Sequence, residues 1–174
     1  MVGLVKQNFQ KNKKLYNQIE KKLKNKLEIN CLITQVGSTA IPNMYGKNII
    51  DILIGVKDDI EFKKITTKLI NIGYFGSKNN KDGIYNFFSS IETETGSGDI
   101  HIHLVIRETE RYNEFIILKN YLLCNELEAK NYSNFKKEIL KKGIKDRKEY
   151  KIIKTEYVSN LISRAKKFND SHVI

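Results

Sequence analysis

The sequence is poor in the residues that mark several protein classes. Its 174 residues include only two cysteines, Cys31 and Cys124, which are too few for a disulfide scaffold and lack metal-ligand spacing. No apolar run approaches the ~20 residues that a transmembrane helix needs, so no such helix is expected. The first residues lack the long apolar core of a signal peptide, so a reducing cytoplasmic location is expected.

Proline and arginine are also scarce. The single proline, Pro42, lies between two apolar segments, and no linker, repeat or low-complexity segment divides the chain. We therefore expect one domain over residues 1–174, with a sheet core at about 28–107 and C-terminal helices at about 109–168.

The net charge of +11 comes mostly from lysine, because only four of the 31 basic residues are arginine. Specific phosphate recognition usually uses the planar fork of arginine, and the sequence shows no RNA-binding motif of alternating basic and aromatic residues. We interpret most of the lysines as a solvated basic surface. A dedicated nucleic-acid site is not favoured.

The strongest signal of function is an acid in an otherwise apolar strand. The stretch Ile33–Val56 reads as a strand, the turn Gly37-Ser38-Thr39, a short connector and a second strand that contains Asp51. A carboxylate among isoleucines is costly unless it is paired or faces a cleft. Gly37 permits close backbone approach, while Ser38 and Thr39 add hydroxyl and amide groups at the end of the strand. These residues predict a phosphate and metal site.

Hydrophobic periodicity predicts the order of the remaining elements. We expect a helix at 8–26, strands at 29–36 and 48–56, a helix at 59–71, a loop or ragged edge at 74–82, strands at 84–91 and 99–106 joined by a hairpin loop at 92–98, and three helices after residue 108. Runs of strands followed by runs of helices indicate an α+β fold: a small mixed β-sheet backed by helices, with a C-terminal helical segment.

Two of the three histidines alternate along one predicted strand. His101 and His103 share a face of the segment 99–106. If that strand neighbours the strand of Asp51, the carboxylate and the imidazoles form one polar patch, in which all three residues are candidates for catalysis and metal binding. The alternative is a hairpin whose solvent face carries polar side chains.

The carboxylate set for metal-dependent chemistry is incomplete. Nucleotidyl transfer usually relies on two Mg²⁺ ions held by carboxylates on adjacent strands. Leu53 stands where the second acid of the usual pair belongs. His101 and His103 suit Zn²⁺, Mn²⁺ or proton transfer better than Mg²⁺. The expected cofactor is therefore a divalent metal, either Mg²⁺ or Mn²⁺, with Zn²⁺ as a further option.

A lysine near the acid is a further candidate. Lys47, four residues before Asp51, can reach a phosphate as a point charge, although it can equally be one more surface lysine. The predicted phosphate- and nucleotide-binding residues are Gly37, Ser38, Thr39 and Lys47. Tyr45, Lys119 and Tyr121 are candidates for the border of the same pocket.

Several motifs, in order along the chain, resemble one family. They are Val36-Gly-Ser-Thr-Ala-Ile-Pro42, Lys47 with Ile49-Ile-Asp-Ile52, and His101-Ile-His-Leu-Val105. From the first predicted helix to about Lys167 the chain resembles the GrpB family, whose fold is nucleotidyltransferase-like and related to the palm of DNA polymerase beta. The resemblance implies a nucleotidyltransferase-like fold. Some relatives are fused to dephospho-coenzyme A kinase, which suggests a function related to nucleotides.

The chain departs from the family pattern in three places. Asn43 stands where glycine usually follows the proline, and Asn48 stands where proline usually follows the lysine. The Arg-rich aromatic stretch before the histidine strand is reduced to Tyr85-Asn-Phe-Phe88. A phosphate-binding arginine of that stretch is therefore missing.

Three functions remain open on the sequence. The first is a nucleotidyltransferase that transfers a nucleotidyl group from a nucleoside triphosphate to a small-molecule or RNA acceptor. The second, favoured by the absent second carboxylate, is a non-catalytic pocket of the same fold that binds a nucleotide or another anionic metabolite. The third, favoured only by net charge, is a basic RNA-binding module. The expected partner is a nucleoside triphosphate or another phosphorylated small molecule.

Overall fold

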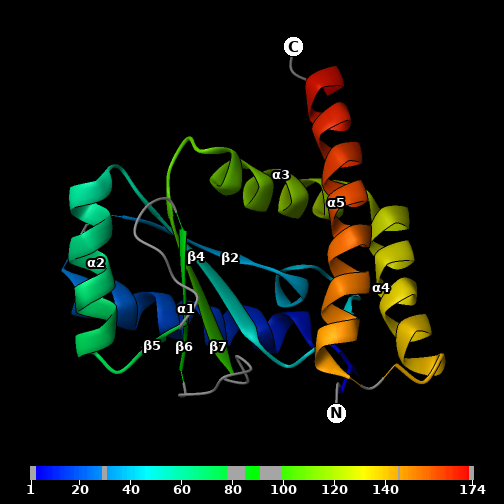
Figure 1. The fold of residues 1–174 in the computed structure, drawn as a ribbon, viewed down its shortest axis with the longest axis horizontal. Coiled ribbons are helices and arrows are strands. Elements are labelled where there is room, and N and C mark those ends of the chain that lie inside the picture. The colour runs from blue at the N-terminus through cyan, green and yellow to red at the C-terminus, as the bar shows by residue number, and fades with distance from the viewer. Residues whose placement is uncertain (1–2, 29–30, 78–84, 91–98, 145, 173–174) are drawn as a thin grey trace.

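A five-stranded mixed sheet forms the centre of the structure, a computed structural model that describes residues 3–28, 31–77, 85–90, 99–144 and 146–172 (Figure 1). The strand order is β2-β4-β7-β6-β5. The strands are β2 (Leu32–Val36), β4 (Ile50–Val56), β5 (Phe75–Gly76), β6 (Tyr85–Ser89) and β7 (Ile100–Ile106). β4 and β7 are parallel neighbours, and every other pair in this sheet is antiparallel.

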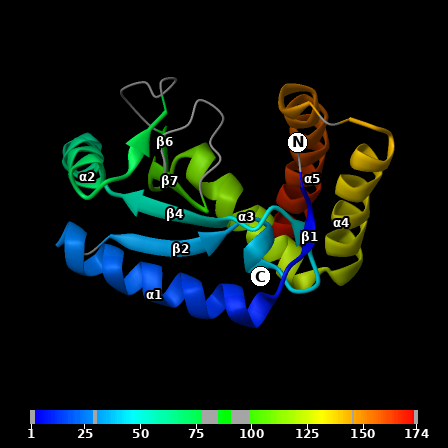
Figure 2. The same cartoon turned by 90° about the horizontal axis from the view of Figure 1, so that it is seen from below.

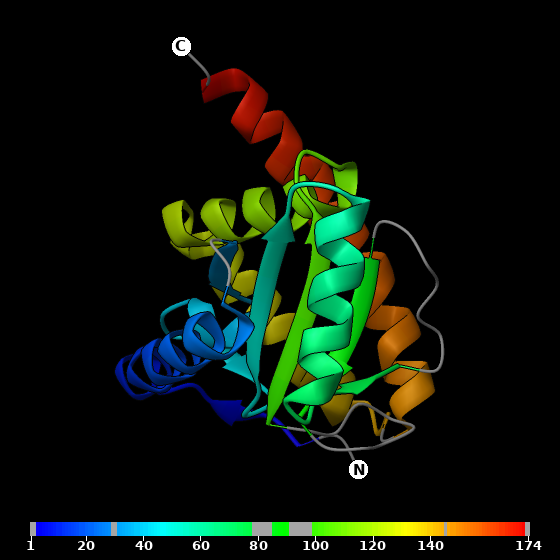
Figure 3. The same ribbon diagram turned by 90° about the vertical axis from the view of Figure 1, so that its left-hand side faces the viewer.

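Two amphipathic helices cover one face of the sheet, α1 (Phe9–Leu27) and α2 (Asp59–Asn71), as Figure 3 shows. Asp58 caps α2, because its side chain accepts a hydrogen bond from the backbone N–H of Glu61 at 2.8 Å. The apolar stripes of both helices meet the alternate, inward-facing residues of β4 and β7 in the main core. This core fixes the register that turns the intervening residues to the opposite face.

Helix α3 (Glu110–Cys124) lies over part of that second face. Val36, Leu53 and Val105 pack there against aromatic and aliphatic side chains of α3. The positions nearer the start of β4 and β7 carry Asp51 and His101 instead. This polar end of the sheet face shares a hollow with Lys136 and Lys154 of the C-terminal helices.

The C-terminal helices α4 (Glu126–Lys141) and α5 (Arg147–His172) stand beside the sheet (Figures 1 and 2). They pack on α3 and on the connector after β2 through a second apolar cluster. Its buried members are Ile41, Met44, Tyr121, Leu122, Ala129, Tyr132, Leu161 and Ala165.

The connector between β2 and β4 contains the 3₁₀ turn η1 (Ser38–Ala40) and the short strand β3 (Tyr45–Gly46). β3 pairs antiparallel with β1 (Val5–Lys6). Gln7 donates side-chain hydrogen bonds to the carbonyls of Gly46 at 2.9 Å and Lys47 at 3.3 Å. From the other side, the Ser133 hydroxyl of α4 accepts a hydrogen bond of 2.7 Å from the Tyr45 N–H. The connector is thus held at both flanks.

The α+β fold, with its mixed sheet and C-terminal helical segment, confirms the expectation from sequence. The structure adds β1, β3 and η1, which the periodicity did not predict. Within the expected loop or ragged edge at 74–82 it has a two-residue edge strand, β5. The expected hairpin loop at 92–98, residues 78–82 and the start of the expected strand at 29–36 lie outside the described residues. Within the described ranges, no helix has both the length and the apolarity to cross a membrane.

Candidate functional site

Asp51 lies at the centre of the polar part of the sheet. The parallel register places it directly opposite His101 of β7. Its Oδ1 lies 3.4 Å from Nδ1 of His101 and 3.6 Å from Nε2 of His103. The Asp51 side chain is 25% exposed. The structure therefore brings the acid and both histidines together around one carboxylate oxygen.

The electrostatics of this group favour an ionised Asp51 beside a neutral His103. Burial opposes ionisation of Asp51, but the contacts from His101 and His103 outweigh it and hold the pKa of the carboxyl well below its usual range. Burial lowers the pKa of His103. The Tyr85 hydroxyl lies 3.0 Å from Nδ1 of His103, and burial raises the pKa of this phenol. The ionised Asp51 carboxylate can only accept, which favours the His103 tautomer with hydrogen on Nε2, and in that tautomer Nδ1 accepts from the Tyr85 hydroxyl. In this arrangement the Nε2–H of His103 points to Asp51.

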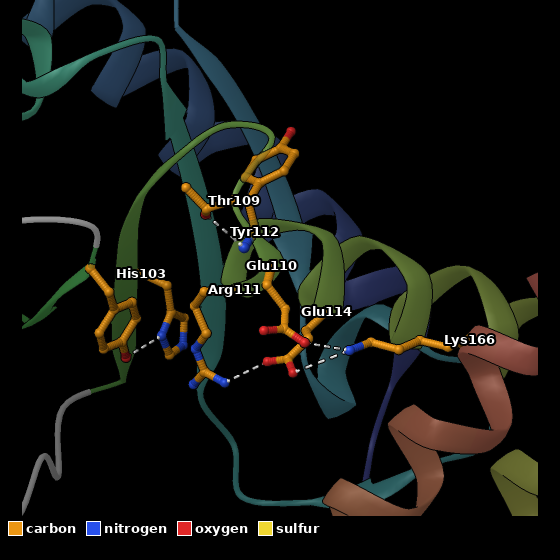
Figure 4. A network of polar contacts seen from close by, with 8 residues as sticks. His103, Thr109, Glu110, Arg111, Tyr112, Glu114 and Lys166 are labelled. Atoms are coloured by element: carbon orange, nitrogen blue, oxygen red, sulfur yellow. Dashed lines mark hydrogen bonds and ion pairs between the residues drawn. The ribbon is translucent and has the colours of Figure 1, made fainter.

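A cation from α3 lies at the His103 end of the face (Figure 4). The Arg111 guanidinium lies 5.2 Å from the ring centroid of Tyr85 and 4.8 Å from that of Phe115. It forms an ion pair of 3.2 Å with Glu114, which also lies 3.8 Å from Lys166 of α5. This network joins α3 to α5, and the positive charge of Arg111 helps to keep His103 neutral.

The glycine–serine turn reaches Asp51 through its first residue. Gly37 has φ +71°, and a Cβ at this position would lie 2.9 Å from Cγ of Asp51. Glycine is therefore required both by the backbone conformation and by the close approach. Thr39 is buried and accepts a hydrogen bond of 3.3 Å from the Gln35 side chain, so its hydroxyl has a structural partner.

A hollow of about 120 Å³, which we call the central hollow, lies between the sheet, the connector and the C-terminal helices. The connector contributes a serine and a lysine, the sheet contributes the Asp51–His101 pair, and α4 and α5 contribute two more lysines. Its lining residues are Leu4, Ser38, Gly46, Lys47, Ile49, Asp51, His101, Lys136, Tyr150 and Lys154.

Lys136 is the most deeply buried cation of the central hollow. Its side chain reaches from α4 so that Nζ lies 2.8 Å from Oγ of Ser38 and 4.4 Å from the ring centroid of Tyr132. Lys136 is 1% exposed. Burial, followed by the charge of Lys154, lowers the pKa of Lys136 to about 7. The nearby Tyr132 and Asp51 instead raise the pKa of Lys154, which stays an ammonium ion.

The predicted residues fall into three groups. Asp51, His101, Ser38 and Lys47 line the central hollow. His103, Gly37 and Thr39 support those residues from outside its lining. None of the expected border residues lines the central hollow. Lys119 donates a hydrogen bond to Thr34, and Tyr121 is buried in the helical core. Tyr45 also lies outside the lining.

Lys136, Tyr150 and Lys154 were missed as site residues from the sequence, although a signal for the lysines exists. Lys136 follows Tyr132 by four residues on the buried stripe of α4, and Lys154 has the same spacing from Tyr150 on α5. A lysine on an apolar stripe is unusual unless it has a function or a partner.

The donor set does not fit a two-magnesium centre. Leu53, at the position of the usual second carboxylate, is 0% exposed and packs in the cluster under α3. Across the described residues, no group of three or more His, Cys, Asp or Glu side chains is arranged to hold a metal ion. The two imidazoles contact the Asp51 carboxylate instead, so the predicted metal role of these three residues stays a prediction.

The mixed sheet, the glycine–serine turn and the acid on the following strand define a nucleotidyltransferase-like fold. The structure of Cid1, an RNA terminal uridylyl transferase, matches with a TM-score of 0.53 at 14% identity, over 81% of this chain and 43% of that one. The crystal structure of the conserved protein GrpB from Enterococcus faecalis matches with a TM-score of 0.79 at 21% identity, over 95% and 99% of the two chains. At these identities the likeness concerns the fold alone.

The sequence comparison narrows the class to a family. The family described as GrpB protein matches residues 4–164, and the chain belongs to that family. The glutamate-rich protein GrpB of Alkalihalophilus pseudofirmus is 32% identical over 135 residues, which cover 75% of this chain and 76% of that protein.

Proposed function

We propose that the central hollow binds the phosphate groups of a nucleotide or of another phosphorylated small molecule. The observation that carries this proposal is the charge of its lining, in which three lysines and a serine hydroxyl face a single carboxylate. Lysine ammonium groups and hydroxyls are suitable donors to phosphate oxygens, and partial burial reduces the screening of their charge by water. The nucleotidyltransferase-like fold supports a nucleotide as the carrier of the phosphates.

Nucleotidyl transfer to a small-molecule or RNA acceptor is the second candidate. Asp51 favours it, because this ionised carboxylate lies in the lining of the hollow beside the His101 imidazole. An imidazole oriented by a carboxylate is a suitable acceptor for the proton of an attacking hydroxyl. Leu53 stands where the second carboxylate of a transferase usually is. For this reason binding without transfer is our first proposal.

Thermal unfolding with and without ligand tests the binding proposal. ATP, GTP, CTP, UTP and inorganic phosphate would each be added in EDTA, and then with Mg²⁺, Mn²⁺ or Zn²⁺. We expect stabilisation in EDTA, which would reach about 2.7 kcal/mol at a ligand concentration of 100 Kd. Lys47→Met should weaken this ligand-induced stabilisation. The matched control is Lys21→Met, which changes an exposed lysine of α1 and should leave the stabilisation unchanged.

Asp51→Asn separates the two candidates. If the hollow only binds anions, removal of the negative charge should leave the ligand-induced stabilisation equal or larger. Stabilisation that requires metal and is lost in Asp51→Asn, together with transfer of label from an α-labelled triphosphate, would favour the transferase. No stabilisation by any nucleotide or by phosphate would overturn the binding proposal.

A further inference from the structure

Within the part of the chain that the structure describes, Lys136 is buried without a negatively charged partner. The groups in contact with its ammonium are the Ser38 hydroxyl, which is neutral, and the face of the Tyr132 ring. No carboxylate of the described residues forms an ion pair with it, and Asp51 acts on it only at longer range. A buried ammonium is costly without an opposite charge, so the side chain is suited to a ligand that brings one.

The size of the central hollow limits what it can contain. Sites that enclose a whole drug-sized ligand usually have about 300–1,000 Å³. The hollow has about 120 Å³, so it can hold a phosphate group while the rest of a nucleotide extends outside. Lys136 and Ser38 both line this space, and a phosphate oxygen can therefore replace the hydroxyl as the partner of Nζ.

The charges of the lining match a dianion once Lys136 is protonated. Lys47, Lys136 and Lys154 then carry three positive charges against the one negative charge of Asp51. A phosphate monoester, or the terminal phosphate of a nucleotide, carries close to two negative charges above pH 7. With a neutral Lys136 the lining would be one charge short of this ligand.

We propose that Lys136 selects a dianionic terminal phosphate and takes up a proton as that phosphate binds. This inference rests on the proposed function and deepens it, because it specifies the charge state of the ligand and the residue that recognises this charge. Lys136 would be a binding residue that exchanges the Ser38 hydroxyl for a phosphate oxygen.

The surroundings of Lys136 support the direction of this linkage. Burial and the Lys154 charge hold the pKa of the free Lys136 near 7, so most of it is neutral at pH 8. A bound dianion would raise that pKa, and the proton must then come from solvent. The titratable groups that face Lys136 from the packed elements are Tyr132 of α4, Tyr150 and Lys154 of α5, Lys47, Asp51 of β4 and His101 of β7.

Titration calorimetry at pH 8 in two buffers of different ionisation enthalpy counts the protons taken up. The probes are ATP in EDTA and inorganic phosphate, because at this pH inorganic phosphate and the terminal phosphate of ATP are both mostly dianionic. We expect close to one proton per bound ATP and an affinity that falls close to tenfold from pH 8 to pH 9.

Lys136→Met should bind ATP more weakly at pH 7 and should lose both the proton uptake and the fall in affinity from pH 8 to pH 9. Lys130→Met, an exposed lysine of the same helix, is the matched control and should keep both. Circular dichroism would verify that each variant folds. Even if Lys136→Met does not fold, ATP binding without proton uptake by the wild-type protein would still overturn the proposal.

The outcomes separate this inference from the proposed function. Binding of ATP or phosphate without proton uptake at pH 8 would overturn the role of Lys136 and leave the binding function intact. Proton uptake that persists in Lys136→Met would do the same, because another group would then bind the proton. If neither probe binds the wild-type protein, the proposed function fails and this inference fails with it.

Discussion

Glycine at position 37 is required by the side chain opposite it. The turn after β2 runs so close to β4 that even one methyl group would collide with the Asp51 carboxylate. The same glycine has a positive φ, which L-residues with a side chain rarely adopt. The position of Asp51 relative to the hollow therefore depends on the absence of a side chain on the neighbouring strand end.

Gly37→Ala should lower the free energy of unfolding by more than its backbone conformation alone explains. For a residue with a side chain, the backbone at φ +71° and ψ −168° costs about 1–3 kcal/mol, and overpacking against Asp51 adds roughly 1–3 kcal/mol. Gly73→Ala is the matched control, because Gly73 has φ +95° but a methyl group there would have no atom within 4 Å. Urea unfolding measures both losses. Equal losses would show that the close approach to Asp51 has no energetic effect.

At the residue scale, the sequence predicted the part of the site that lies on β-strands. Strand alternation placed His101 and His103 on one face, and the parallel register with β4 then brought them to Asp51. Lys136 escaped prediction because it is 98 residues from Ser38, with which it forms its hydrogen bond. In a chain this rich in lysine, composition does not distinguish a buried lysine from the solvated ones.

At the scale of elements, the connector between β2 and β4 is positioned by contacts from both ends of the chain. β1 pairs with it on one side, and α4 contacts it on the other through Ser133. Because Gly46 and Lys47 line the central hollow, the geometry of the site depends on these contacts between distant elements.

Ser133→Ala should destabilise the protein by about 1–2 kcal/mol, because it leaves the N–H of Tyr45 without its partner in a partly buried position. Chemical denaturation provides the measurement. Ser163→Ala removes an exposed hydroxyl that bonds within α5 and should change stability by less than about 0.5 kcal/mol. A Ser133→Ala protein as stable as the Ser163→Ala control would contradict this role of the connector contact.

The elements that the sequence predicted are those long enough to show a hydrophobic periodicity. α1 and α2 each carry an apolar stripe, and the N-cap at Asp58 was recognisable. β1, β3 and β5 have two residues each, which is too short for an alternating pattern. These strands form because of tertiary contacts with distant parts of the chain, so the local sequence does not predict them.

For the whole molecule, charge is distributed differently outside the hollow and inside it. α1 alone presents seven exposed lysines along its length: Lys11, Lys13, Lys14, Lys21, Lys22, Lys24 and Lys26. These side chains are solvated, whereas Lys136 is buried. Salt screens the solvated charges strongly and the buried one much less.

Binding of RNA to this outer surface should therefore be weak, unspecific and sensitive to salt. With a net charge of +11, we expect affinity for a fluorescent oligouridine to fall by at least about tenfold between roughly 50 and 200 mM salt. Fluorescence anisotropy measures this, and Lys136→Met should leave it unchanged. Salt-resistant RNA binding that Lys136→Met abolishes would instead show that RNA enters the central hollow.

The pairing of β1 with β3 has a practical consequence for all of these measurements. Leu4 is part of the wall of the hollow, and Gln7 fixes the carbonyls of Gly46 and Lys47. Removal of Leu4, or a peptide fused directly in front of it, should therefore disturb the lining of the central hollow. The far end of α5 points away from the sheet (Figure 1), so purification and labelling handles belong there.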